Sequence, residues 1–231
     1  MQQRIQPILA RYQNKIEKAI RSGDATDAIL RELFEELRAA LGPEIATITT
    51  GRMMQLMDEV GIGADMAVIS QEALEHARRY TYDLVTGLDS TTRRLVQEAL
   101  TTWQGTPGMT RADLVSLLEP AFGEYRANMI AVTEVTRAYS AATNQYQQMA
   151  LDAGVEMRRV WLTLRDQLVC PICGPFHGMP ESVWNIQYPD GPPAHPNCRC
   201  SAELTVETEE EALARGALAQ EERRRVLEEL A

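Results

Sequence analysis

Apolar residues recur at intervals of three and four along the first part of the chain. Between residues 6 and 41 this spacing predicts two helices, with a break at residues 22–24, where Asp24 can cap the second helix. We expect Gly42-Pro43 to end that helix, because proline cannot donate a backbone hydrogen bond. A third helix is then predicted at residues 44–60.

The same periodicity continues after a predicted turn at residues 61–65. Two further helices are predicted at residues 71–86 and 91–103, separated at residues 87–90 by a polar segment that can cap the second of them. Glycine and proline then mark a loop at residues 104–108. Up to this loop, helices are the only regular elements that we predict.

A capping signal opens the next part of the chain. Thr110, with the acidic Asp113 three residues later, has the chemistry of a helix N-cap and predicts a short helix through Leu118. Pro120 then bends the chain into a long helix, predicted at residues 123–151. We expect this long helix to be the central element against which the shorter helices pack.

The pattern changes to alternation after Gly154. Residues 155–163 and 201–206 both alternate between apolar and polar positions, which predicts two strands that can pair antiparallel. Two strands alone are marginally stable in water, so this part needs another source of stability. The predicted fold is therefore mainly α, with a small α+β C-terminal module that binds zinc.

The zinc prediction comes from the cysteines, all four of which lie in two short clusters. Cys170 and Cys173 form a C-x-x-C turn, which supplies two thiolates from one bend, as a tetrahedral zinc ion requires. The second cluster adds a histidine and two further cysteines at similar spacing. Four coordination positions thus have five candidate ligands: Cys170, Cys173, His195, Cys198 and Cys200.

The residues leave open which four of these groups bind. Cys170 and Cys173 are the firmest pair, and the H-x-x-C spacing of His195 and Cys198 mirrors theirs. In one arrangement, only one of Cys198 and Cys200 is a ligand and the other is merely its neighbour. In the other, all four cysteines bind and His195 supports a ligand from outside the coordination shell. Disulfides are disfavoured, because no secretory signal precedes the fold. Since the donors over-fill the shell, we expect a structural zinc site rather than a catalytic one.

The charge balance bears on possible partners. The 231 residues include 33 acidic and 23 basic ones, for a formal net charge of −10, which argues against a broad DNA-binding surface. Arg158-Arg159 is a local basic candidate, whereas residues 223–225 have acidic neighbours on both sides. Residues 207–231 are predicted to form a charged helix with a solvated face. With no run of 18 apolar residues, we expect a soluble chain made in a reducing cytoplasm.

Two further residues near the cysteines, His177 and Asp166, suggest an alternative function in combination with His195. A zinc-dependent nuclease or hydrolase could use His177, His195 and Asp166. A lone histidine in a Gly/Pro-rich loop is more often a solvated or hydrogen-bonded side chain, and we favour that interpretation for His177. The carboxylate of Asp166 can accept backbone N–H groups in its turn, or pair with Arg137 or Arg199.

Two pairs of residues have structural interpretations. Glu134 and Arg137 are three positions apart on the long predicted helix, and we favour an ion pair on its surface. We also expect this helix to carry both residues towards the zinc module. Trp161 and Trp184 are the expected packing anchors of that module.

These motifs, taken together, resemble the phage Mu F-like head morphogenesis family, the minor capsid proteins of tailed phages and prophages. The resemblance covers roughly residues 111–206. It is carried by Thr133-Glu134-x-x-Arg137, then Trp161-x-x-x-x-Asp166-x-x-x-Cys170-x-x-Cys173, then Pro192-Pro193-x-His195-Pro196-Asn197-Cys198-Arg199-Cys200.

The resemblance implies a non-enzymatic virion protein, present in few copies and associated with the portal vertex during procapsid assembly. Its expected partners are the phage portal protein and, as further candidates, the scaffold or major capsid protein. Assembly would take place in the bacterial host cytoplasm. On this basis we predict a helical region at residues 1–108, the head morphogenesis module with its zinc site at 109–206, and a charged helix at 207–231.

Overall fold

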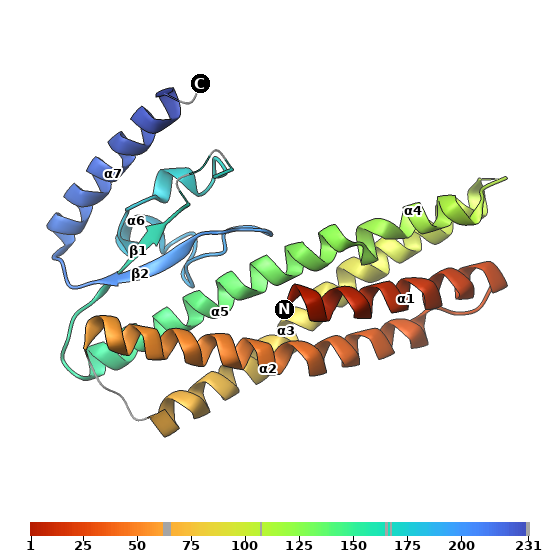
Figure 1. Cartoon of the computed structure of the whole chain (residues 1–231), viewed down its shortest axis with the longest axis horizontal. Helices are drawn as coiled ribbons and strands as arrows, with labels where there is room; N and C mark the ends of the chain where they lie inside the picture. Colours follow the sequence, from red (N-terminus) through yellow and green to blue (C-terminus); the bar gives the residue numbers. More distant parts are fainter. Residues whose placement is uncertain (62–65, 107, 165, 167, 230–231) are drawn as a thin grey trace. The chain divides into compact units, whose positions relative to one another are not determined.

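The computed structural model describes residues 1–61, 66–106, 108–164, 166 and 168–229 (Figure 1). These residues are mainly helical and include a two-stranded antiparallel sheet near the C-terminus, as predicted. Contacts divide the chain into two compact units: unit 1 is Met1–Ala46 with Leu74–Ala131, and unit 2 is Thr47–Ala73 with Val132–Ala231. None of the described helices is long and apolar enough to cross a membrane.

The first two helices are separated where the sequence predicts a break. Helix α1 is Gln2–Ser22 and helix α2 is Asp27–Val60. Gly23 ends α1 in the left-handed region, at φ 77°, and its N–H donates to the carbonyls of Ala19 and Ile20. Glycine adopts this conformation without steric cost, so the position of the break follows from the sequence.

The predicted helix end at Gly42-Pro43 is wrong, because α2 runs through both residues. Proline removes one backbone donor from the helix. The apolar face nevertheless continues at a spacing of four residues on either side, and Leu37, Leu41 and Ile45 are all buried. Burial of these side chains outweighs the loss of one hydrogen bond.

The predicted boundary at residues 87–90 is also wrong, because helix α3, Met66–Gly105, runs through it. The hydroxyl of Ser90 donates to the carbonyl of Gly87 within the same helix and does not cap a new one. In the predicted turn at residues 61–65, Gly61 has a φ of 77°. The rest of that turn, residues 62–65, lies outside the described residues.

The capping box predicted after this helix is confirmed. Helix α4 is Arg111–Phe122, and the Thr110 hydroxyl accepts the N–H of Asp113 while the Asp113 carboxylate accepts the N–H of Thr110 at 2.7 Å. The helix continues through Pro120, past the predicted end, because its last turn buries Ala121 and Phe122. The long helix is confirmed as α5, Glu124–Asp152.

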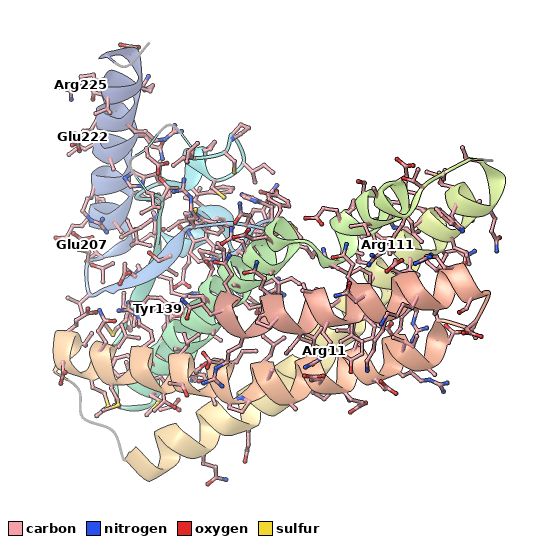
Figure 2. The ribbon with its side chains drawn as sticks, turned by 45° about the vertical axis from the view of Figure 1, so that its right-hand side comes forward. Arg11, Arg111, Tyr139, Glu207, Glu222 and Arg225 are labelled. Carbon is pink, nitrogen blue, oxygen red and sulfur yellow. The ribbon has the colours of Figure 1, made fainter. Side chains whose placement is uncertain are left out.

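Unit 1 contains a buried carboxylate at the contact between α1 and α4. Glu17 on α1 is buried and accepts two hydrogen bonds from the Arg111 guanidinium, at 3.0 and 3.2 Å, and one from Arg21 at 3.0 Å. Figure 2 labels Arg111 at the start of α4. The side chains of Arg111 and Arg21 are 62% and 50% exposed, so guanidinium groups at the surface neutralise the buried carboxylate of Glu17.

Unit 2 contains the predicted sheet. Strand β1, Arg158–Leu162, pairs antiparallel with β2, Ser201–Thr205, and Val160 lies opposite Glu203. The other edge of β1 is also paired, because Trp161 donates to the carbonyl of Met179 and accepts the N–H of Gly178. The sheet is therefore extended by an irregular segment, and the chain between the strands is held against β1.

Helix α7, Glu209–Glu229, is the charged C-terminal helix that the sequence predicts. It begins with a second capping box, in which Thr208 and Glu211 exchange backbone and side-chain hydrogen bonds. One face is not solvated, because Ala212 and Gly216 are buried. The prediction of a solvated helix therefore holds only for the opposite face of α7.

Candidate metal centre

The first half of the centre is a tight turn that follows β1. The N–H of Cys173 points at the sulfur of Cys170, at 3.3 Å, and the N–H of Gly174 donates to the carbonyl of Cys170 at 3.0 Å. A short 3₁₀ helix, η1 (Gly174–Phe176), continues from this turn. A backbone N–H directed at sulfur favours the thiolate, which is the form that binds metal.

The second half is a turn ahead of β2. The N–H of Cys198 bonds to the carbonyl of His195 at 3.3 Å, which brings the two side chains to the same side of the turn. Asn197, between them, has a φ of 62°. Asparagine tolerates this left-handed conformation better than most residues with a side chain, which explains how a non-glycine residue can close the turn.

The fold brings all five predicted ligands together in two overlapping groups. Cys173 and His195 are 3.5 Å apart from sulfur to Nε2, and the sulfurs of Cys173 and Cys198 are 3.7 Å apart. Sulfurs bound to one zinc ion at about 2.3 Å in a tetrahedron lie about 3.8 Å apart, so these separations suit zinc. Within each group the donor atoms lie within 4.8 Å of one another; the groups are Cys170, Cys173 and His195, and Cys173, Cys198 and Cys200.

The electrostatics of the cluster also favour a cation. Hydrogen bonds lower the pKa of Cys198 to about 2, with the largest contribution from the Cys173 thiol and the next largest from Cys200. The hydrogen bond of Cys173 with Cys198, followed by its bond with Cys200, raises the pKa of Cys173 above its ordinary value. Burial opposes ionisation of Cys170, but backbone N–H groups lower its pKa overall. A proton is thus shared among sulfurs that a metal ion would hold as thiolates.

The space at the centre suits an ion and is too small for a substrate. A cavity of about 30 Å³ is lined by Cys170, Cys173, His195 and Cys200, together with neighbouring apolar side chains. This is about the volume of one water molecule. The donor set and the cavity therefore fit a closed, structural zinc site, whereas a catalytic site would need an open position.

An aromatic cluster packs beneath the cysteines. Trp161 is fully buried, and its ring centroid lies 5.3 Å from that of Trp184, 5.4 Å from Phe176 and 5.6 Å from Tyr188. This core also includes Cys173, Cys198 and Cys200. The two tryptophans are the packing anchors that the sequence predicts. The indole Nε1 of Trp161 is buried without a hydrogen-bond partner among the described residues.

Helix α5 binds the second turn through two threonines. Thr136 donates its hydroxyl to the carbonyl of Cys198 at 2.8 Å, and Thr133 accepts the N–H of Asn197 at 2.8 Å. Sequence reasoning missed this contact, although the Thr-x-x-Thr spacing places both hydroxyls on one face of the helix. The long helix does reach the candidate site, as predicted, but through different side chains.

The interpretation of Glu134 and Arg137 as a surface ion pair is wrong for one of them. Arg137 is exposed, whereas Glu134 is only 3% exposed. The helix face that carries Glu134 turns inward because the buried Thr133 and Ala138 lie beside it. Glu134 therefore belongs to the interior of unit 2.

Asp166 has both of the predicted kinds of partner. Its carboxylate accepts two hydrogen bonds from the Arg199 guanidinium, at 2.8 and 2.9 Å, and one from the N–H of Leu168 at 3.0 Å. The bonds from Arg199 lower the pKa of Asp166. Arg199 and Asp166 thus link the two cysteine turns from outside the sulfur cluster.

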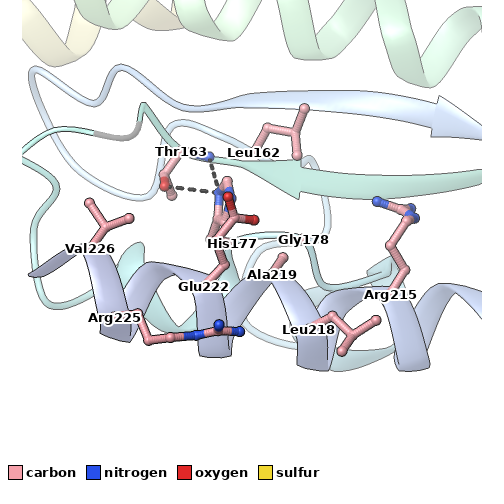
Figure 3. A pocket seen from close by; sticks show the side chains of 10 residues that line it. All are labelled: Leu162, Thr163, His177, Gly178, Arg215, Leu218, Ala219, Glu222, Arg225 and Val226. Carbon is pink, nitrogen blue, oxygen red and sulfur yellow. Dashed lines mark hydrogen bonds between the residues drawn. The ribbon is translucent and has the colours of Figure 1, made fainter.

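His177 lies apart from the sulfur cluster. Its ring is 6% exposed, and Nδ1 accepts the N–H of Thr163 at 3.1 Å, as expected for a hydrogen-bonded structural histidine. Figure 3 shows this contact beside α7. Among the described residues, no candidate metal group contains His177 or Asp166, so the structure does not assemble the nuclease site considered from the sequence.

The basic candidate Arg158-Arg159 is not an open patch. Arg159 is mostly buried, stacks on Trp184 at 5.0 Å and donates to the carboxylate of Glu181 at 2.6 Å. Arg158 pairs with Glu209 at 3.1 Å. Acidic side chains therefore neutralise both guanidinium groups within the fold.

The sequence profile of the family described as Phage Mu protein F like protein matches residues 105–203. This segment is similar to that family. The resemblance predicted from the motifs is thereby confirmed, and the Mu F-like segment contains all five candidate ligands and both threonines of α5. No curated protein and no solved structure gives a significant match to the chain. The family match supports a role in phage head morphogenesis.

Proposed function

We propose that the protein is a minor capsid protein that acts at the portal vertex during procapsid assembly. The observation that carries the proposal is the Mu F-like segment, which contains the whole candidate metal centre. Its role there is structural: it provides a rigid module that the portal protein recognises. The scaffold and the major capsid protein are further candidate partners.

We propose in addition that this module is held together by one structural zinc ion. Cys173 is the central ligand, because it belongs to both groups of donors. Zinc, when bound, would supply the cross-link between the two turns. The chain itself supplies the closed shell, the backbone N–H groups directed at sulfur and the aromatic core beneath it.

The zinc proposal is tested by elemental mass spectrometry on protein purified without chelator, together with a count of reactive thiols. We expect about one zinc per chain and protected thiols. Cobalt substitution then distinguishes the ligand sets, because the thiolate-to-metal absorption grows with the number of bound sulfurs. Loss of His195 leaves this absorption unchanged if the four cysteines bind. A protein without metal whose cysteines all react freely contradicts the proposal.

The portal proposal is tested by mixing the purified protein with the portal ring of the same phage and separating the complexes by size. We expect binding that survives high salt, because the net charge of −10 gives no general attraction to nucleic acid or to acidic surfaces. Quantitative mass spectrometry of virions should find a few copies per particle. Absence from procapsids and virions, with no binding to the ring, would refute the assignment.

A further inference from the structure

A side chain of helix α7 donates to several backbone carbonyls in the segment that follows the C-x-x-C turn. The amide nitrogen of Gln220 lies 2.6 Å from the carbonyl oxygen of His177 and 3.1 Å from those of Gly174 and Pro175. These carbonyls follow Cys173 directly in the chain. Their convergence on one donor therefore depends on the path of the backbone just after the C-x-x-C turn.

The helix and this segment also approach closely through small residues. A Cβ atom at Gly216 would lie 2.8 Å from both the carbonyl oxygen of Gly178 and the sulfur of Met179. One at Gly178 would lie 2.7 Å from the Cβ of Ala219. Such separations leave no room for any side chain, so the helix is fitted to one conformation of residues 174–179.

The start of α7 is held differently. Arg158 on β1 binds the Glu209 carboxylate at 3.1 Å and the carbonyl of Glu207 at 2.9 Å, and Arg215 pairs with Glu207 at 2.7 Å. None of these residues is a candidate ligand or lies next to one in the sequence. The helix thus has one attachment to the sheet and a second, farther along, to the segment that follows the C-x-x-C turn.

We propose that the docking of α7 depends on the metal: the filled centre fixes the carbonyls that bind Gln220, and loss of the metal releases the helix from Gly216 onwards. The first turn of α7 stays attached to β1 in both states. This inference rests on the proposed zinc site, because a bound metal would tie the turn at Cys170 and Cys173 to the second cysteine cluster. On this proposal, α7 is docked along its whole length only when the metal centre is filled.

Docking of α7 also creates a groove. A cavity of about 780 Å³ lies between the end of β1 and α7 (Figure 3). Helix α7 contributes one wall of it, and His177 and Leu162 belong to the other side. The residues on the wall from α7 include Arg215, Leu218, Glu222, Arg225 and Val226. Release of the helix removes that wall, so the surface available to a partner changes with the state of the metal.

Hydrogen–deuterium exchange of the full chain, with zinc and with a chelator, tests the proposal. We expect protection of the amides of residues 216–226 to fall roughly tenfold on chelation, since about one to two net hydrogen bonds are lost. Amides of residues 212–214 should change much less. If zinc is bound and removed but residues 216–226 keep their protection, the inference is wrong. If no zinc is bound at the outset, the proposed zinc site fails instead, and the portal proposal is untouched.

Two variants separate docking from metal binding. Gly216→Ala strengthens the intrinsic helix propensity of α7 but places a methyl group against Gly178, so we expect release of the helix with zinc still bound. Gly51→Ala on α2 is the matched control, because a Cβ there meets nothing within 4 Å. Gln220→Glu, which replaces the donor by an acceptor, should act like Gly216→Ala. Full protection of residues 216–226 in both α7 variants would overturn the proposal.

Discussion

The helical unit 1 and the metal module of unit 2 reach stability by different routes. Unit 1 buries long rows of apolar side chains on helices that the periodicity predicts, and these helices run through both of the breaks predicted at Gly42-Pro43 and residues 87–90. The metal module has a sheet of two strands and an irregular chain between them. It compensates with a packed cluster of cysteine sulfurs and four aromatic rings, and with hydrogen bonds to backbone carbonyls. The stability of unit 1 should therefore be most sensitive to truncation of buried apolar side chains, and that of the module to substitution of its candidate metal ligands.

The largest effect is expected from a substitution that unfolds part of the metal module and leaves unit 1 folded. Cys173→Ser removes the one donor shared by both ligand groups, so we expect loss of zinc and unfolding of the segment between the strands. Exchange protection of α1 and α4 should persist. Cys200→Ser, which affects only one group, should lose less zinc. Equal zinc content in the Cys173→Ser variant and the parent would show that the donors have been misassigned.

Truncation of a core side chain in unit 1 should lower the stability of the protein by an amount that does not depend on the metal. Leu33 on α2 is fully buried, and Leu33→Ala should destabilise the protein by about 2–5 kcal/mol. The loss should be the same with and without a chelator, as measured by urea unfolding followed through helical circular dichroism. A cost that appears only in the metal-free protein would mean that the two regions are not energetically distinct.

The contact between α5 and the second cysteine turn, at Asn197 and Cys198, offers a smaller and more local test. Thr136→Val keeps the shape of the side chain but leaves the buried carbonyl of Cys198 without its donor, at a cost of about 1–3 kcal/mol. We expect faster zinc release to a competing chelator. Thr136→Ser retains the hydroxyl and is the matched control. Identical release rates for the two variants would exclude a role for this hydrogen bond.

The smallest expected effect is a pH dependence in unit 1. Burial disfavours ionised Glu17, but the hydrogen bonds from Arg111 and Arg21 outweigh it and lower its pKa below the ordinary 4.5. Its contribution to stability is thus present above pH 4.5 and lost as the pH falls through the lower folded-state pKa. Urea midpoints at neutral and acidic pH should show a shallower acid dependence for Glu17→Gln than for the parent. If the urea midpoints of the variant and the parent fall equally with pH, the acid sensitivity comes from groups other than Glu17.

The same contrast explains what the sequence could predict. Helix positions follow from local periodicity, and the capping box at Thr110 and Asp113 depends on residues three positions apart. The clustering of the five candidate ligands was predictable, because metal chemistry restricts both the residue types and their spacing. Pairing of β1 with β2 was also predictable, since each strand carries its own alternation.

The errors arose where distant contacts override a local signal. Burial on both sides of Gly42-Pro43 keeps α2 intact. The threonines on α5 and Gln220 on α7 were missed because their partners are backbone carbonyls and N–H groups far away in the chain. Backbone groups are present at every residue, so no residue pattern marks them in advance.

The separation of the two cysteine turns has a consequence for how the protein is made. Cys198 follows Cys173 by 25 positions, so the ribosome releases half of the metal centre well before the other half. The last segment of unit 1, Leu74–Ala131, has already been synthesised by then. The growing chain can therefore complete its helical unit first. During that interval the early thiols must stay reduced and unpaired if they are to meet their partners when these emerge.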